Sequence, residues 1–204
     1  MEPLFGTLII CPVLIGRRAA LATLRMLVER ARSGKGQIVL LSGEAGIGKS
    51  RLVAEAKTYA TAQGFLLLQG QCFPTDRSCP YAPLLDLLRA HLGTSSTEHV
   101  VAEMGSLASA LSPLLPDLLP LPSDLPPLPS LDPEQEKRRL FAALAQLFLR
   151  KATQQPALLI VEDLHWSDET SLDFLHYLAR RCAASPLLVL LTYRSDEVPP
   201  GLSD

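Results

Sequence analysis

The chain has 204 residues, of which 48% are hydrophobic and 20% charged, and its net charge is −2. That length suits one or two domains with a sizeable core. The charge balance argues against direct nucleic-acid binding, because a dedicated binder carries a basic patch. The four cysteines form no C-x-x-C pair and show no zinc-ligand spacing, so we expect free thiols. No apolar run is long enough to cross a membrane, and we expect a cytoplasmic protein.

The first half of the chain predicts a βαβ unit. Leucine and valine recur at three- and four-residue spacing in residues 16–34, which predicts a helix. The apolar run over 37–43 is typical of a buried parallel strand. A helix over 49–63 and a strand over 65–70 follow, and the crossover between the two strands should be right-handed. Residues 1–12 are an uninformative leader, and we assign residues 13–198 to one core domain and 199–204 to a tail.

The second half continues the alternation after a proline-rich interruption. Short helices are predicted over 81–93 and 97–111. Eight of the seventeen prolines fall between positions 113 and 133, so residues 112–133 are predicted to be an extended surface excursion. The alternative is a polyproline ligand for a partner. Asp132 and Pro133 should begin a helix that runs to about 152. A strand over 157–163, a helix over 167–182 and a strand over 187–194 complete an α/β fold with a mainly parallel sheet.

The stretch GEAGIGKS matches the phosphate-loop pattern G-x-x-x-x-G-K-[ST] between a predicted strand and a predicted helix. Its glycines let successive backbone N–H groups point at phosphate oxygens, and the start of the helix adds its positive end. Lys49 should reach the β- and γ-phosphates, and Ser50 should coordinate Mg²⁺. The alternative is a glycine turn with an incidental lysine, which the strand and helix context disfavours. The predicted nucleotide-binding residues are Gly43, Glu44, Ala45, Gly46, Ile47, Gly48, Lys49 and Ser50.

A pair of acids ends the predicted strand over 157–163. Glu162 and Asp163 follow four apolar residues, as expected for the carboxylates that hold the metal and orient the attacking water. The commoner order places aspartate first. Either Glu162 supports the metal and Asp163 polarises water, or the roles are redistributed. Slow turnover, or binding without efficient hydrolysis, is a further alternative.

Together these motifs resemble one family. The segments GEAGIGKSRLVAE, QCFPTDRSCPYAPLLDLLR, VEDLHWSDETSLDFL and LLTYRSDE are similar to the AAA-type, origin-recognition-like ATPase module of bacterial signal-transduction ATPases. That module stands at the N-terminus of large LuxR-type transcriptional regulators and of some adenylate/guanylate cyclases. The resemblance covers nearly the whole chain from Val13 onward. It implies a P-loop NTPase fold, ATP and Mg²⁺ as cofactors, and other ATPase protomers or a downstream effector domain as partners.

The resemblance also implies roles for residues outside the two motifs. It places Gly16 and Arg17 near the adenine base, and it makes Arg194 a sensor of the γ-phosphate, against the alternative of a solvated charge. His165 and Trp166 match a His-Trp signature, which we interpret as packing of the loop beside the metal site rather than as catalysis. A contact from Arg180 and Arg181 to a neighbouring protomer's phosphates is the alternative to ordinary charge at a helix end.

The chain departs from the family after Arg194. Members continue into a fifth strand, a helical lid and further domains, so we expect a fragment, a truncated product or a module completed by another chain. The strand with the phosphate loop should then be an exposed edge that is prone to pairing. Three rival functions remain: a nucleotide-binding interaction scaffold without hydrolysis, a small-molecule or nucleoside kinase, and a DNA-replication-type loader. The last two lack an acceptor-pocket pattern and a basic surface, respectively.

Overall fold

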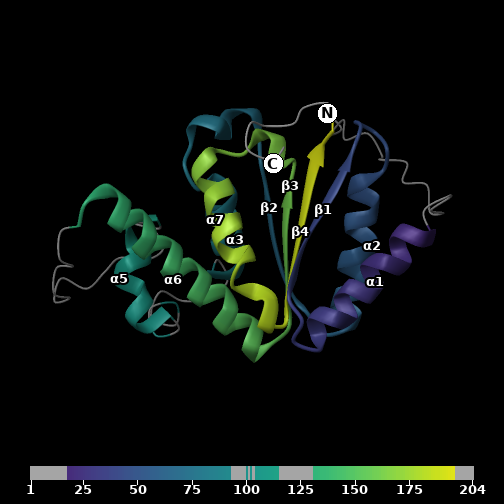
Figure 1. Ribbon diagram of the computed structural model, residues 1–204, viewed down its shortest axis with the longest axis horizontal. Coiled ribbons are helices and arrows are strands. Elements are labelled where there is room, and N and C mark those ends of the chain that lie inside the picture. The colour runs from purple at the N-terminus through teal and green to yellow at the C-terminus, as the bar shows by residue number, and fades with distance from the viewer. Residues whose placement is uncertain (1–17, 93–99, 101, 103, 115–130, 196–204) are drawn as a thin grey trace, which may run out of the picture.

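The structure, a computed structural model, describes residues 18–92, 100, 102, 104–114 and 131–195. It is a three-layer α/β arrangement in which one parallel sheet lies between two groups of helices (Figure 1). The predicted fold class is confirmed. None of the described helices is both long enough and apolar enough to cross a bilayer.

Four strands form the sheet in the order β1-β4-β3-β2, all parallel: β1 is Gln37–Gly43, β2 is Leu66–Gln71, β3 is Ala157–Glu162 and β4 is Leu187–Arg194. The two central strands are buried on both faces, from Ala157 to Val161 and from Leu187 to Thr192. Continuous apolar runs of this kind are what a strand covered by helices on both sides requires. Because all strands run the same way, their carboxyl ends meet at one edge of the sheet (Figure 1).

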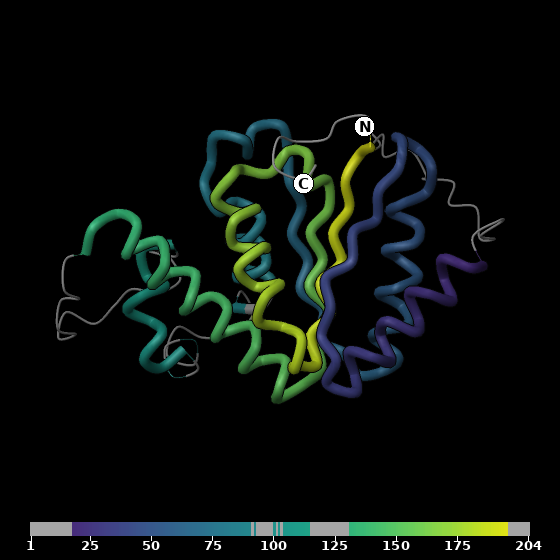
Figure 2. The backbone as a smooth tube through the Cα atoms, viewed as in Figure 1, coloured from purple at the N-terminus to yellow at the C-terminus, as the bar shows by residue number. Residues whose placement is uncertain are grey.

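Helices cover both faces of the sheet (Figure 2). On one face lie α1, Arg18–Arg32, and α2, Lys49–Ala62, which pack with the even-numbered residues of β3 and β4, such as Ile160 and Leu190. On the other face lie α3, Ala82–Leu92, α6, Pro133–Gln154, and α7, Glu169–Ala179. The short helix α5, Ala108–Leu111, packs beside α6 away from the sheet (Figure 1).

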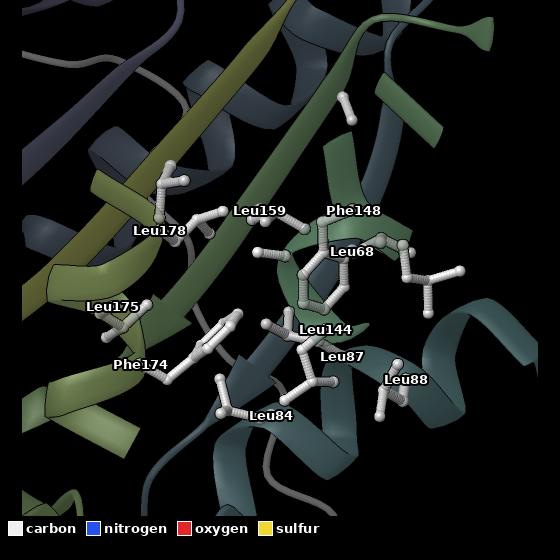
Figure 3. Packing of buried hydrophobic residues seen from close by; sticks show 14 of the residues in the cluster. Leu68, Leu84, Leu87, Leu88, Leu144, Phe148, Leu159, Phe174, Leu175 and Leu178 are labelled. Carbon is white, nitrogen blue, oxygen red and sulfur yellow. The ribbon is translucent and has the colours of Figure 1, made fainter. Parts of the chain in front are cut away.

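The larger core cluster lies between the sheet and the second group of helices. Phe174 of α7 is fully buried, and its ring centroid is 5.5 Å from that of Phe141 and 6.2 Å from that of Phe148, both on α6. Leucines of α3 and of the sheet, including Leu84 and Leu159, close the cluster around these rings (Figure 3). This packing fixes α6 and α7 against the sheet, including β3, whose end carries the acid pair.

The element boundaries differ from the sequence predictions where local turns intervene. The helix expected over 97–111 is interrupted, because a 3₁₀ turn at Gly105–Leu107, with Gly105 at φ 54°, precedes the short helix α5, which ends at Leu111. The helix expected over 167–182 begins only at Glu169. Asp168 caps it, its carboxylate accepting a hydrogen bond from the Ser171 backbone N–H at 2.9 Å. Most of the proline-rich excursion lies outside the described residues.

Candidate functional site

The phosphate loop connects β1 to α2 at the carboxyl edge of the sheet, and its backbone explains its glycines. Gly46 and Gly48 have φ values of +74° and +97°, a left-handed conformation that L side chains rarely adopt. A Cβ at either position would meet no atom within 4 Å, so backbone conformation rather than lack of space demands glycine there. The loop side chains of Glu44, Ala45 and Ile47 are exposed. The turn therefore lies on the surface of the protein, with its side chains exposed to solvent.

The first turn of α2 has its free backbone N–H groups beside this loop. Gly48 is the N-cap and supplies no side-chain cap, and the first turn carries no acidic side chain. Uncapped N–H groups and the helix dipole together make such an end a ready anion site. The loop and helix therefore have the backbone arrangement that the sequence pattern predicts for a phosphate cradle.

Lys49 places its ammonium group at the centre of the loop. Its Nζ donates to the Gly43 carbonyl at 2.7 Å and to the Glu44 carbonyl at 2.9 Å. The side chain thus folds back over the turn instead of extending into solvent. A positive charge held there supplements the N–H groups of the loop in attracting an anion.

Glu162 ends β3 close to the start of α2. The Gln69 Nε2 donates to the Glu162 Oε1 at 2.8 Å, and the Ser50 hydroxyl is close enough to favour the charged carboxylate. Burial, followed by the negative charge of Asp163, raises the pKa of Glu162 above its usual value, while Lys57, Ser50 and Gln69 oppose that rise. A half-buried carboxylate next to a serine hydroxyl is a hard-oxygen pair of the kind that Mg²⁺ prefers.

Asp163 lies one residue beyond the strand in a left-handed conformation, with φ 58°. Its N–H donates to Thr192 Oγ1 at 3.0 Å, and its carboxylate accepts from Gln71 Nε2 at 3.3 Å. Glu162 and Asp163 thus have different amide partners, Gln69 for Glu162 and Gln71 for Asp163. The division of roles in which Glu162 supports the metal and Asp163 polarises water stays a prediction.

Arg194 is the last residue of β4 and pairs in register with Gly43, the first residue of the phosphate loop. The next residue, Ser195, donates its N–H to the Gly43 carbonyl at 3.3 Å. The half-buried Arg194 side chain therefore originates directly beside the loop, and its role as a phosphate sensor stays a prediction. Gly16 and Arg17, the predicted adenine contacts, lie outside the described residues.

The His-Trp pair packs as interpreted. His165 is buried, and its carbonyl accepts a hydrogen bond from Arg77 at 3.2 Å, while the Arg77 guanidinium lies 4.5 Å from the centroid of the Trp166 ring. These contacts tie the 3₁₀ turn that follows the acid pair to the loop after β2. Arg180 and Arg181 occupy the end of α7, where Arg181 donates to a backbone carbonyl of the last helical turn, as helix-terminal charges do.

Sequence reasoning missed four polar residues of the site: Lys57, Gln69, Gln71 and Thr192. The available signal was the alternation Gln-Gly-Gln at the end of an otherwise leucine-rich strand, since polar residues at a carboxyl strand edge face a site. Lys57 carried no such signal, because a lysine within a helix is ordinarily solvated.

The residues present fit a magnesium ion held mainly by a nucleotide. Among the described residues, no group of three or more His, Cys, Asp or Glu side chains could hold a metal alone. Mg²⁺ with nucleotides commonly takes one or two protein oxygens, phosphate oxygens and several waters. Ser50 and Glu162 supply that number.

Comparison with known proteins then places the chain. The family model described as "AAA ATPase domain" matches residues 13–190. The chain belongs to this AAA ATPase domain family. An AAA ATPase domain is a nucleotide-binding ATPase module, which agrees with the phosphate loop and the acid pair described above.

Two further similarities concern the AAA domain as a part of larger proteins. The domain is 32% identical over 194 residues to an uncharacterized protein of Rhizobium meliloti (strain 1021), and the match covers 89% of this chain but only 18% of that protein. It is also similar to a solved structure of the Aeropyrum pernix ORC2 protein in ADPNP–ADP complexes. That match has 17% identity and a TM-score of 0.48, and it covers 91% of this chain and 43% of the other. The chain thus spans about a fifth of the length of the relative that it matches in sequence.

Proposed function

We propose that this AAA domain binds ATP with Mg²⁺ and hydrolyses it, and that it acts as a cytoplasmic regulatory module of a signal-transduction ATPase linked to transcriptional regulation. One observation carries the ATPase part of the proposal. The phosphate loop between β1 and α2, the Glu162 carboxylate at the end of β3 and an arginine in register with Gly43 meet at the same edge of one sheet. The regulatory part rests on the resemblance of the sequence segments quoted above.

In this proposal each residue has a separate task. The loop N–H groups and Lys49 bind the β- and γ-phosphates, and Arg194 responds to the γ-phosphate. Ser50 and Glu162 hold the Mg²⁺ shell, and the ion, when bound, neutralises charge on the phosphates. Asp163 orients and polarises the attacking water. In a full-length relative, the γ-phosphate would hold the module in one arrangement and its loss would release that arrangement.

A second candidate function is nucleotide binding without efficient hydrolysis. It is favoured by the hydrogen bond from Gln71 to the Asp163 carboxylate, at 3.3 Å, because that bond competes with a water molecule for the proposed base. Aspartate also has a shorter reach than glutamate. The interaction scaffold and the ATPase share the same binding site and differ only in turnover.

Phosphate release from the purified chain separates the two functions. We expect Mg²⁺-dependent release by the wild type. Asp163→Asn should lower turnover by about 10²-fold or more, the loss typical of a missing general base. Glu162→Gln should also lower turnover, and both variants should retain most of the ATP affinity because the loop is intact.

The matched control is Glu134→Gln, an acid-to-amide change at an exposed residue that pairs with Arg138 on α6. It should leave turnover unchanged. Full turnover in both Glu162→Gln and Asp163→Asn would remove the acid pair from the reaction, and no release by the wild type despite ATP binding would establish the scaffold.

A further inference from the structure

A chain of three polar side chains runs from α2 through β2 to the acid pair. Lys57 Nζ donates to Gln69 Oε1 at 2.5 Å, and Gln69 Nε2 donates to Glu162 Oε1 at 2.8 Å. All three residues are partly buried. Hydrogen bonds among partly buried polar groups are shielded from water and hold their partners more firmly than exposed ones do.

Backbone geometry explains why these residues meet. Gln69 is in register with Ile160, so its side chain shares the face of the sheet that α1 and α2 cover. Glu162 lies two residues after Ile160 and points to the same face, because strand side chains alternate. On α2, Lys57 follows Ser50 by seven residues, close to two helical turns, so both side chains project from one side of the helix.

Lys57 and Glu162 together determine how the Gln69 amide is oriented. An ammonium group only donates hydrogen bonds and a carboxylate only accepts them. With its oxygen on Lys57, the amide must present its NH₂ group to Glu162. The flipped amide would place NH₂ against the ammonium and oxygen against the carboxylate, and both contacts would be repulsive. Without Lys57, the contact with Glu162 alone would favour this orientation, and the amide oxygen would lose its donor.

The amide also has an advantage over a direct ion pair. A lysine bonded directly to Glu162 would place a full positive charge where a cation is to bind. Gln69 instead is a neutral donor that occupies Oε1, and a carboxylate has further lone pairs on both of its oxygens for other partners. The chain of hydrogen bonds from Lys57 through Gln69 therefore fixes the Glu162 carboxylate and leaves it able to accept a hydrogen bond from a metal-bound water.

We propose that Lys57 and Gln69 are positioning residues that hold the Glu162 carboxylate for the Mg²⁺ shell. The inference rests on the proposed function, since it concerns the same site. Partners of metal ligands act in this way generally, and their loss typically costs about 10- to 100-fold in metal affinity.

The test compares ATP affinity, measured by calorimetry, in EDTA and in excess Mg²⁺. In wild type we expect Mg²⁺ to tighten binding. Lys57→Met and Gln69→Met should leave the affinity in EDTA within about twofold of wild type and reduce the gain from Mg²⁺ by about 10-fold or more. Lys57→Arg should keep the wild-type gain, because a guanidinium also donates to the amide oxygen.

Lys137→Met is the matched control, since it removes another half-buried lysine with a carboxylate partner, Asp173, at 2.6 Å. It should behave as wild type. If Mg²⁺ tightens ATP binding by Lys57→Met and by Gln69→Met as much as it does in wild type, the inference is overturned and the proposed function is not. Equal loss of affinity with and without Mg²⁺ would also overturn it, because the residues would then act on the nucleotide or the fold. A wild type that binds no ATP would overturn the proposed function, and this inference with it.

Discussion

At the scale of single residues, two cysteines of the chain differ in burial and should therefore differ in reactivity. Cys72 is 1% exposed, and burial, opposed by a hydrogen bond from Ser167, raises the pKa of its thiol to about 12. Cys79, seven residues along the chain, is exposed. The thiolate is the nucleophile in alkylation, so the two thiols should differ widely in reactivity.

We predict that iodoacetamide at pH 8 modifies Cys79 and leaves Cys72 unmodified in the folded chain. A pKa of about 12 instead of 9.0 leaves roughly a thousandfold less thiolate, and burial blocks access in addition. Peptide mass spectrometry after timed labelling measures both sites. Labelling in guanidinium chloride is the control and should modify both cysteines, whereas equal rates in the native state would contradict the described burial.

At the residue scale, the sequence predicted backbone structure best where a motif specifies it. The GEAGIGKS segment joins β1 to α2 as the pattern predicts, with Gly48 as the N-cap of the helix, and the binding of a nucleotide by these residues stays a prediction. The partners of Glu162 were not predictable in that way. Gln69 is 93 residues from Glu162 in the sequence, and only the strand order β3-β2 and its register bring the two together.

At the scale of elements, strands were predicted more closely than helix ends. The apolar runs that became β1, β3 and β4 are found within a residue of their expected limits. The expectation of a buried strand is confirmed for the central strands β3 and β4 but is wrong for β1, which is an edge strand of the described sheet with no fully buried residue. Helix ends depended on local turns instead. A 3₁₀ turn over Leu164–Trp166 occupies the space before α7, and no propensity argument distinguishes it from the first turn of a longer helix.

The exposed edge of the sheet at β1 affects whether the chain associates with other chains. Among the described strands, β1 has β4 on one side only, as expected. Leu40 of this strand is 43% exposed, and it lines an apolar hollow of 210 Å³ together with Ile38, Leu164, Leu172, Leu175, His176, Ala179 and Leu191. Unpaired backbone groups beside an apolar surface favour pairing with another chain.

We predict that the isolated chain self-associates with increasing concentration and that Leu40→Lys suppresses this association, because a lysine on an edge strand opposes pairing. Sedimentation velocity over a concentration series measures the effect. Met26→Lys is the matched control, since Met26 is 51% exposed but lies on α1 rather than on a strand edge. Equal association of Leu40→Lys and wild type would show that the β1 edge is not responsible.

At the scale of the whole molecule, the fold serves to bring the carboxyl ends of β1, β3 and β4 together. The phosphate loop, the acid pair and Arg194 come from segments far apart in the sequence, and the parallel order of the sheet places them at one edge. The βαβ pattern predicted this edge, because ligands of open α/β sheets bind at the carboxyl ends of strands. The strand order itself could not be obtained from local patterns.

The central claim is that the backbone amides of the turn over 43–50, with Lys49, bind the polyphosphate of ATP. Calorimetric titration of wild type and Lys49→Ala with ATP in the presence of Mg²⁺ tests it most directly. The account predicts one ATP per wild-type chain and an affinity at least about tenfold weaker in Lys49→Ala, since a hydrogen bond from a charged group contributes about 1.5–3 kcal/mol. An unchanged affinity in Lys49→Ala, with the variant folded, would contradict it.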